Sequence, residues 1–143
     1  MAQLEAFLSS ILKAAQKYPQ HPAVVLSLRD NNHTQFSKDE LNSTKEGTLK
    51  SSYQKKILNY KSMVSHSIVL AQYLSAHTRP DEIIAIFGEK NFLIYSTLLA
   101  CMIANRCFLP LNPKRSSTYL KSLLVQAGSK ILINCEEDSG HFS

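Results

Sequence analysis

The fold is decided by residues 83–113, which read IIAIFGEKNFLIYSTLLACMIANRCFLPLNP. A short apolar run ends at Gly88, a helix-length apolar run follows Asn91, and a second short apolar run extends from Cys107 to Leu111. Two strand-length runs on either side of a helix-length run are typical of a βαβ crossover. Charged residues are nearly absent from all three runs, as in a parallel sheet that is covered on both faces. This stretch therefore predicts an α/β fold.

The same patterns predict further elements on both sides of this centre. We expect helices at 1–19, 60–77 and 119–127, and strands at 23–28, 57–60 and 130–134. The last three strands alternate with helices, which predicts right-handed crossovers and a parallel sheet. The first two strands are expected to form an antiparallel edge hairpin. The predicted architecture is a three-layer, mainly parallel sheet with flanking helices.

Two segments look different from the rest of the chain. Residues 29–56 are rich in Asn, Ser, Thr and Lys, and we interpret them as a polar, mobile insertion that is either disordered or has a specific role. Residues 135–143 are mostly polar and are expected to form a frayed tail. We expect residues 1–143 to form a single, incomplete α/β domain, with 57–134 as its βαβαβ core.

The composition excludes several classes of protein. With 44% hydrophobic and 19% charged residues the chain is globular, and no apolar run reaches the roughly 20 residues of a membrane span. The net charge of +5 comes from scattered lysines and arginines, so we expect no nucleic-acid partner. The three cysteines, Cys101, Cys107 and Cys135, show no paired spacing, and two of them lie in predicted core elements. Free, mostly buried thiols and the lack of a secretory signal favour a cytoplasmic protein.

No motif in the sequence carries a recognisable chemistry. Neither glycine-rich phosphate-binding pattern occurs, and there is no G-x-S-x-G. The histidines (21, 33, 66, 77 and 141) are scattered, and Glu136, Glu137 and Asp138 fit a solvated tail better than a metal site. The turn from Gly88 to Asn91 suggests an anion site at a helix N-terminus, but a simple turn with Asn91 as the helix cap is the stronger interpretation. We assign no catalytic, cofactor-binding or metal-ligating residue.

Three segments together resemble the N-terminal part of the adenylate-forming superfamily, which includes acyl-CoA synthetases, luciferase-like ligases and nonribosomal peptide synthetase adenylation domains. Residues 58–63 (LNYKSM) resemble L-T-Y-x-E-L, and residues 80–86 (PDEIIAI) resemble P-G-D-x-V-A-I. Residues 100–113 resemble A-x-x-K-A-G-x-x-F-V-P-L-D-P. The chain departs from the pattern at Ser62, Ile103 and Asn105, which stand for Glu, Lys and Gly. Asparagine is the next-best residue at a left-handed helix end, so the last change is mild.

The resemblance implies an enzyme that uses ATP and Mg²⁺ to convert a carboxylic acid into an acyl-adenylate and then transfers the acyl group to a thiol or amine. The family's phosphate loop, adenine-binding segment and catalytic lysine lie beyond the matched region. The chain therefore resembles an N-terminal scaffold that is inactive alone, and the remainder of the ligase is its expected partner.

Two alternatives stay open at this point. A non-catalytic interaction module of the same fold would bind a protein partner, or form a homo-dimer, to cover its apolar faces. A small α/β enzyme with a site anchored at Gly88 to Asn91 is least favoured, because no nucleophile–base pair is visible.

Overall fold

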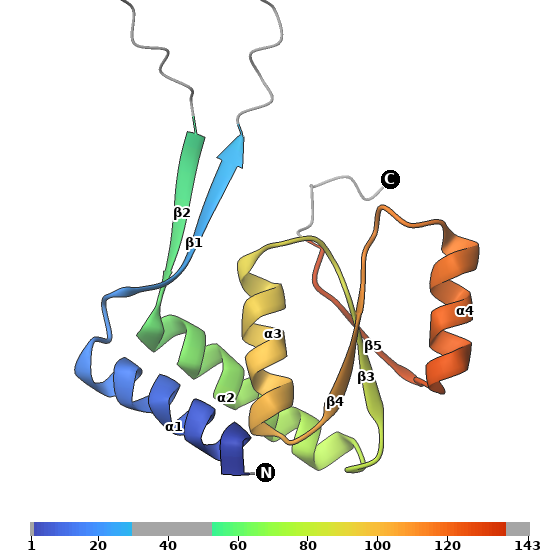
Figure 1. Ribbon diagram of the computed structural model, residues 1–143, viewed down its shortest axis with the longest axis horizontal. Coiled ribbons are helices and arrows are strands. Elements are labelled where there is room, and N and C mark those ends of the chain that lie inside the picture. Colours follow the sequence, from blue (N-terminus) through green and yellow to red (C-terminus); the bar gives the residue numbers. More distant parts are fainter. Residues whose placement is uncertain (1, 30–52, 137–143) are drawn as a thin grey trace, which may run out of the picture.

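The computed structural model describes residues 2–29 and 53–136 and contains alternating helices and strands in the predicted order (Figure 1). The elements are α1 (Ala2–Lys17), β1 (Pro22–Arg29), β2 (Tyr53–Asn59), α2 (Tyr60–His77), β3 (Ile83–Phe87), α3 (Phe92–Ile103), β4 (Cys107–Leu111), α4 (Ser117–Ala127) and β5 (Ile131–Asn134). The predicted mobile segment falls largely within residues 30–52, which lie outside the described residues.

The parallel sheet has three strands in the order β4-β3-β5, with β3 in the middle. Ile84 of β3 lies opposite Phe108 of β4 and Ile131 of β5, and both strand pairings are parallel. Figure 1 shows α3 and α4 on opposite sides of this sheet. The helix α2 packs against α3 and shares its core with β3. The predicted three-layer α/β architecture is confirmed.

The hairpin of β1 and β2 is antiparallel, as predicted, and forms a two-stranded sheet of its own. β2 begins at Tyr53, well before the predicted start at Ile57, and Tyr60 already belongs to α2. The polar residues at the start of β2 resembled a loop in sequence, but their backbones pair with Ser27 and its neighbours. Cross-strand hydrogen bonding thus overrides the weak strand propensity of these side chains.

The main core lies between the parallel sheet and the helices α2 and α3. Ile84 and Ile86 pack there against Leu74 of α2 and against Ala100 and Cys101 of α3. The alanines on both helices leave room for close packing, which explains how α3, apolar on nearly every side, is covered. A second cluster joins α1, α2, the hairpin and α3 around Leu58, Met63, Val64 and Leu99.

Two helix ends adopt the left-handed conformation expected from sequence. Gly128 ends α4 at φ 63°, and Asn105 follows α3 at φ 53°. After Asn105, the backbone N–H of Arg106 donates to the Cys101 carbonyl oxygen at 2.8 Å, which closes the helix end. Asparagine therefore substitutes here for the glycine of the adenylate-forming pattern.

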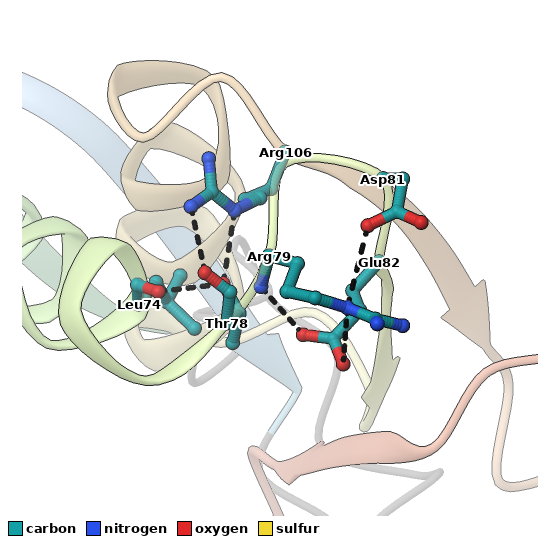
Figure 2. A network of polar contacts seen from close by, with 6 residues as sticks. All are labelled: Leu74, Thr78, Arg79, Asp81, Glu82 and Arg106. Carbon is teal, nitrogen blue, oxygen red and sulfur yellow. Dashed lines mark hydrogen bonds and ion pairs between the residues drawn. The ribbon is translucent and has the colours of Figure 1, made fainter.

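Arg106 then ties this helix end to the end of α2 (Figure 2). Its Nε donates to Thr78 Oγ1 at 2.9 Å, its Nη2 to the Thr78 carbonyl at 3.0 Å and its Nη1 to the Ala104 carbonyl at 2.6 Å. Nearby, Arg79 lies 3.6 Å from Asp81 and 3.9 Å from Glu82 in partly exposed ion pairs. The guanidinium thus links the end of α2 to the end of α3, just before β4 begins.

The cysteines differ in part from the sequence-based expectation. Cys101 is buried as expected, but Cys107 is exposed because it starts the edge strand β4. Cys135, assigned by sequence to a frayed tail, is 1% exposed. The chain continues in contact with the core beyond the end of β5. The sequence did not indicate this contact, because the residues after Cys135 are polar.

Ser67 holds α2 against α3. Its side chain is fully buried, and its hydroxyl oxygen lies 2.7 Å from the Met63 carbonyl oxygen and 2.9 Å from the Ser96 carbonyl oxygen. The O–H group can donate to either, so a polar residue is satisfied at a helix–helix contact that has no room for a larger side chain.

We expect Ser67→Ala to lower the free energy of unfolding by about 1 kcal/mol, because one buried hydrogen bond is lost. Ser67→Leu should cost ~1–3 kcal/mol, because the larger side chain forces the helices apart. Urea unfolding followed by circular dichroism measures both. Ser65→Ala, at an exposed position of the same helix, is the matched control. A Ser67→Leu protein as stable as the wild type would contradict the close contact.

Candidate functional site

The carboxyl ends of β3 and β4 form the crevice that is the candidate site. The chain leaves β3 toward α3 on one side of the sheet and leaves β4 toward α4 on the other (Figure 1). Neighbouring strands whose connections run to opposite sides leave a crevice between their carboxyl ends, where α/β proteins commonly bind ligands.

The crevice has a volume of about 530 Å³. Its floor and walls are apolar and come from β3, α3 and β4, whereas its rim is polar and comes from the two connections. The apolar lining is Ile86, Ile94, Leu98, Pro110 and Leu111, and the rim is Gly88, Glu89, Lys90, Asn112 and Lys114. A small apolar group with a polar end matches this division.

An ion pair crosses the rim. Lys114 Nζ lies 3.6 Å from Glu89 Oε1, with the two side chains 76% and 53% exposed. An ion pair this open to solvent contributes little to stability. The side-chain oxygen of Asn112 accepts a hydrogen bond from the backbone N–H of Lys114 at 2.9 Å, which shapes the turn after β4. The pair lies at one side of the crevice, and its positive and negative charges offset each other.

Gly88 lets the chain after β5 approach the end of β3. The backbone N–H of Gly88 donates to the Leu111 carbonyl at 3.2 Å, and that of Cys135 donates to the Phe87 carbonyl at 2.8 Å. A Cβ atom at Gly88 would lie 3.1 Å from Ile94 Cδ1 and 3.2 Å from the Cys135 carbonyl carbon and Cβ. Glycine is therefore required here by the close approach of neighbouring backbone.

Asn91 fixes the wall of the crevice with both ends of its side-chain amide. Its Oδ1 accepts a hydrogen bond from the Ile94 N–H at 2.9 Å, so the predicted cap of α3 is confirmed. Its Nδ2 donates to the Cys135 carbonyl at 2.6 Å. The side chain is buried, and both of its polar atoms have a protein partner. The turn that the sequence suggested as an anion site is thus a structural joint between the start of α3 and the segment that follows β5.

The two buried thiols behind this joint are weak nucleophiles. Burial raises the pKa of Cys101 from 9.0 to about 11, with the nearby Cys135 adding to the shift. Burial also raises the pKa of Cys135, opposed by its contact with Thr97 Oγ1 at 3.4 Å. Both thiols are neutral at physiological pH and form part of the core.

Those histidines and acidic residues noted in the sequence that the structure describes, His21, His66, His77 and Glu136, do not line the crevice. His66 is exposed on α2, His21 stacks on Tyr18, and His77 stacks on Tyr73 with its Nδ1 2.9 Å from the Tyr73 carbonyl. His33, His141, Glu137 and Asp138 lie outside the described residues. Within residues 2–29 and 53–136, no three His, Cys, Asp or Glu side chains gather as metal ligands. None of the described helices is long and apolar enough to cross a membrane.

Sequence reasoning identified one side of the crevice and missed the other. Gly88 and Asn91 were singled out, but Asn112, Lys114 and Cys135 were not. The sequence could have indicated Asn112 and Lys114, because both follow the carboxyl end of β4, the strand adjacent to β3. Nothing in the sequence pointed to Cys135, whose role depends on a contact 44 residues away.

The fold is shared with solved structures although no family model and no curated protein matches the sequence. A fatty acid AMP ligase from Legionella pneumophila superposes with a TM-score of 0.66 at 11% identity, covering 89% of this chain and 19% of that one. The N-terminal subdomain of Klebsiella oxytoca NpsA superposes with a TM-score of 0.62 at 18% identity, covering 89% of this chain and 26% of that one.

A third match is PA1221, an NRPS protein containing adenylation and PCP domains, with a TM-score of 0.59 at 14% identity over 90% of this chain and 21% of that one. The chain thus spans about a fifth to a quarter of the structures it matches. At these identities the matches establish a common fold. The resemblance to the N-terminal part of adenylate-forming enzymes, expected from three sequence segments, is confirmed at that level.

Replacing Asn91 should separate its two roles. Asn91→Ser keeps a capping oxygen but loses the bond to Cys135, and we expect a loss of about 1 kcal/mol in the free energy of unfolding. Asn91→Ala loses both and should cost about 2 kcal/mol. Chemical denaturation measures both values. Ser116→Ala, which removes only the cap of α4, is the control. Equal losses for Asn91→Ser and Asn91→Ala would contradict the bond to Cys135.

Thiol labelling should separate the exposed cysteine from the two buried ones. Cys107 is expected to react with a disulfide reagent in the folded protein, and Cys101 and Cys135 only after unfolding. A folded Cys107→Ser protein should therefore show no rapid reaction with the reagent.

The raised pKa of Cys101 also has a consequence for stability. The thiol ionises in the unfolded chain from pH 9 upward and in the folded chain only near pH 11. Its contribution to stability is thus complete below pH 9 and declines as the pH rises toward 11.

In the labelling experiment, rapid reaction of all three thiols at neutral pH would contradict the burial of Cys101 and Cys135.

Proposed function

We propose that this chain is the N-terminal scaffold of an adenylate-forming ligase, an enzyme that activates a carboxylic acid with ATP to an acyl-adenylate and transfers the acyl group to a thiol. In this proposal the 143 residues have a structural role in the enzyme and do not catalyse the reaction alone. The three free cysteines favour a reducing, cytoplasmic setting.

One observation supports the proposal most. About nine-tenths of the chain shares its fold with a structure described as an N-terminal subdomain, and the other matches include a fatty acid AMP ligase. Over the same residues, three sequence segments follow the adenylate-forming pattern in the right order. The fold and the order of the sequence segments therefore point to the same region of one family.

The crevice does not suit ATP with Mg²⁺. Magnesium prefers carboxylate and phosphate oxygens in an octahedral arrangement, and Glu89 is the sole carboxylate among the lining residues. Lys114 already neutralises it at 3.6 Å. The rim also lacks a series of backbone N–H groups on successive glycines that would hold a triphosphate. In this proposal ATP and Mg²⁺ bind to parts of the ligase other than these residues.

A non-catalytic interaction module is the second candidate, and exposed apolar side chains favour it. Val125 on α4 and Val69 on α2 are 80% and 67% exposed, and Leu132 on β5 is half exposed. Such positions on a partial fold call for a covering partner. The remainder of a ligase would supply that cover in the first proposal and a separate protein in the second.

An ATP–pyrophosphate exchange assay tests the scaffold proposal. The isolated chain, supplied with ATP, Mg²⁺ and panels of fatty acids and amino acids, should give no exchange above background. The Legionella pneumophila fatty acid AMP ligase serves as the positive control for the assay. Acid-dependent exchange by the isolated chain would disprove its role as an inactive scaffold.

Gel filtration with an apolar dye discriminates the two candidates. The ligase scaffold is supported if the isolated chain binds the dye and becomes more stable when a following Ser/Thr/Gly-rich phosphate-loop segment of the same reading frame is present. A clean monomer that binds no dye counts against the interaction module.

A further inference from the structure

One lysine at the rim of the crevice lacks a counter-charge. The rim holds two lysines, Lys90 and Lys114, and one carboxylate, Glu89. Lys114 Nζ lies 3.6 Å from Glu89 Oε1, whereas Lys90 has no ion-pair partner among residues 2–29 and 53–136. The side chain of Lys90 is exposed. The rim therefore carries one positive charge in excess, beside an apolar floor.

The apolar floor of the crevice is only partly covered. Ile86 and Leu111 at its base are each 2% exposed, but Ile94 and Leu98 of α3 are half-buried and Pro110 of β4 is exposed. The open space of about 530 Å³ lies within the range of pockets that enclose a small ligand. A large apolar side chain therefore fits on this floor, and its binding removes apolar surface from water.

The chain that follows β5 is held beside the same rim. The backbone N–H of Cys135 donates to the Phe87 carbonyl at 2.8 Å, and the Cys135 carbonyl accepts from Asn91 Nδ2 at 2.6 Å. A Cβ atom at Gly88, which lines the crevice, would lie 3.2 Å from the Cys135 carbonyl carbon. Residue 136 is the last that the structure describes. The chain therefore continues from a fixed point next to the crevice.

The continuing sequence has the chemistry that complements the crevice. Residues 137–143 read EDSGHFS, so that with Glu136 they begin as three consecutive carboxylates. Glu136 is exposed and makes no ion pair within the part of the chain that the structure describes. Four residues after Asp138 comes Phe142, the one large apolar residue of the segment. Acidic groups followed by an aromatic ring match a rim with an unpaired lysine and an apolar floor.

We propose that residues 137–143 dock in the crevice between β3 and β4, with the carboxylates of Glu137 and Asp138 near Lys90 and the Phe142 ring on the apolar floor. The segment is long enough, because the seven residues from Cys135 to Phe142 span up to roughly 23 Å when extended. Neighbouring strands are only about 5 Å apart, and the crevice begins at the turn that already holds Cys135. This proposal goes beyond the scaffold function and rests on no part of it.

The covalent connection favours this segment over a free ligand or a separate protein. A group joined to its site by a short linker has an effective concentration in the millimolar range, so a contact too weak to hold a free molecule is populated. Free phosphate is a poorer match. Lys90 is the one unpaired cation among the described residues that line the crevice, and Asn91 Oδ1 already accepts the Ile94 N–H at the start of α3.

NMR spectroscopy of the 143-residue chain, with labelled Ile and Leu methyl groups, tests the proposal. Nuclear Overhauser effects should connect the Phe142 ring protons to the methyl groups of Ile94 and Leu98. Phe142→Ala should remove these contacts together with the ring-current shifts of both methyl groups. Phe7→Ala is the matched control, since it removes a half-exposed phenylalanine from α1 and should leave the crevice methyl groups unchanged.

A charge variant tests the polar half of the contact. Lys90→Glu should lower the ratio of docked to undocked molecules by about tenfold, because repulsion replaces attraction to the acidic segment. Lys121→Glu makes the same change at an exposed lysine on α4 and should leave the ratio unchanged. The ring-current shifts of the crevice methyl groups report the ratio, and circular dichroism confirms that every variant folds.

Three results would overturn the proposal. One is the absence of contacts between Phe142 and the methyl groups of Ile94 and Leu98 in the wild-type chain. Another is an effect of Lys121→Glu as large as that of Lys90→Glu. The third is a crevice contact that forms only between differently labelled copies, or only after a second polypeptide or inorganic phosphate is added, which would assign the crevice to that occupant.

Discussion

The structure depends on the burial of the three central residues of β3 between two layers of helices. Ile84 and Ala85 are fully buried and Ile86 nearly so, although consecutive residues of a strand face opposite sides. Both sides of the sheet must therefore be covered, one by α3 and the other by α4. The connections that carry the chain to these opposite layers separate at the carboxyl ends of β3 and β4. The crevice is a geometric result of covering the strand and exists whether or not it binds anything.

Most of the fold was predictable because it is encoded in short-range patterns. The order of all helices and strands follows from apolar periodicity, and Asn91, Asn105 and Gly128 mark helix ends through their own conformational preferences. The start of β2 and the burial of Cys135 were not predictable in this way. Both are decided by backbone partners distant in the sequence, and neither leaves a trace in local composition.

The candidate site divides in the same manner. Gly88 and Asn91 could be chosen from sequence, since a glycine after a strand and a capping residue before a helix have recognisable positions. The Glu89–Lys114 pair required knowledge that β3 and β4 are adjacent. Once that adjacency is known, the one carboxylate of the rim is paired with Lys114 and the helix cap is occupied by protein groups. In the scaffold proposal, these properties belong to a supporting element of the fold.

The double bonding of Asn91 also sets an order of events during synthesis. Its bond to Ile94 spans 3 residues and can form as soon as α3 nucleates, whereas its bond to Cys135 spans 44. At translation rates of roughly 5–20 residues per second, the second partner emerges about 2–8 seconds after the first. During that interval the amino end of α3 is capped but not anchored, and β3 lacks its β5 neighbour. The nascent chain therefore passes through a state with one edge of β3 open, and it leaves that state only when β5 arrives.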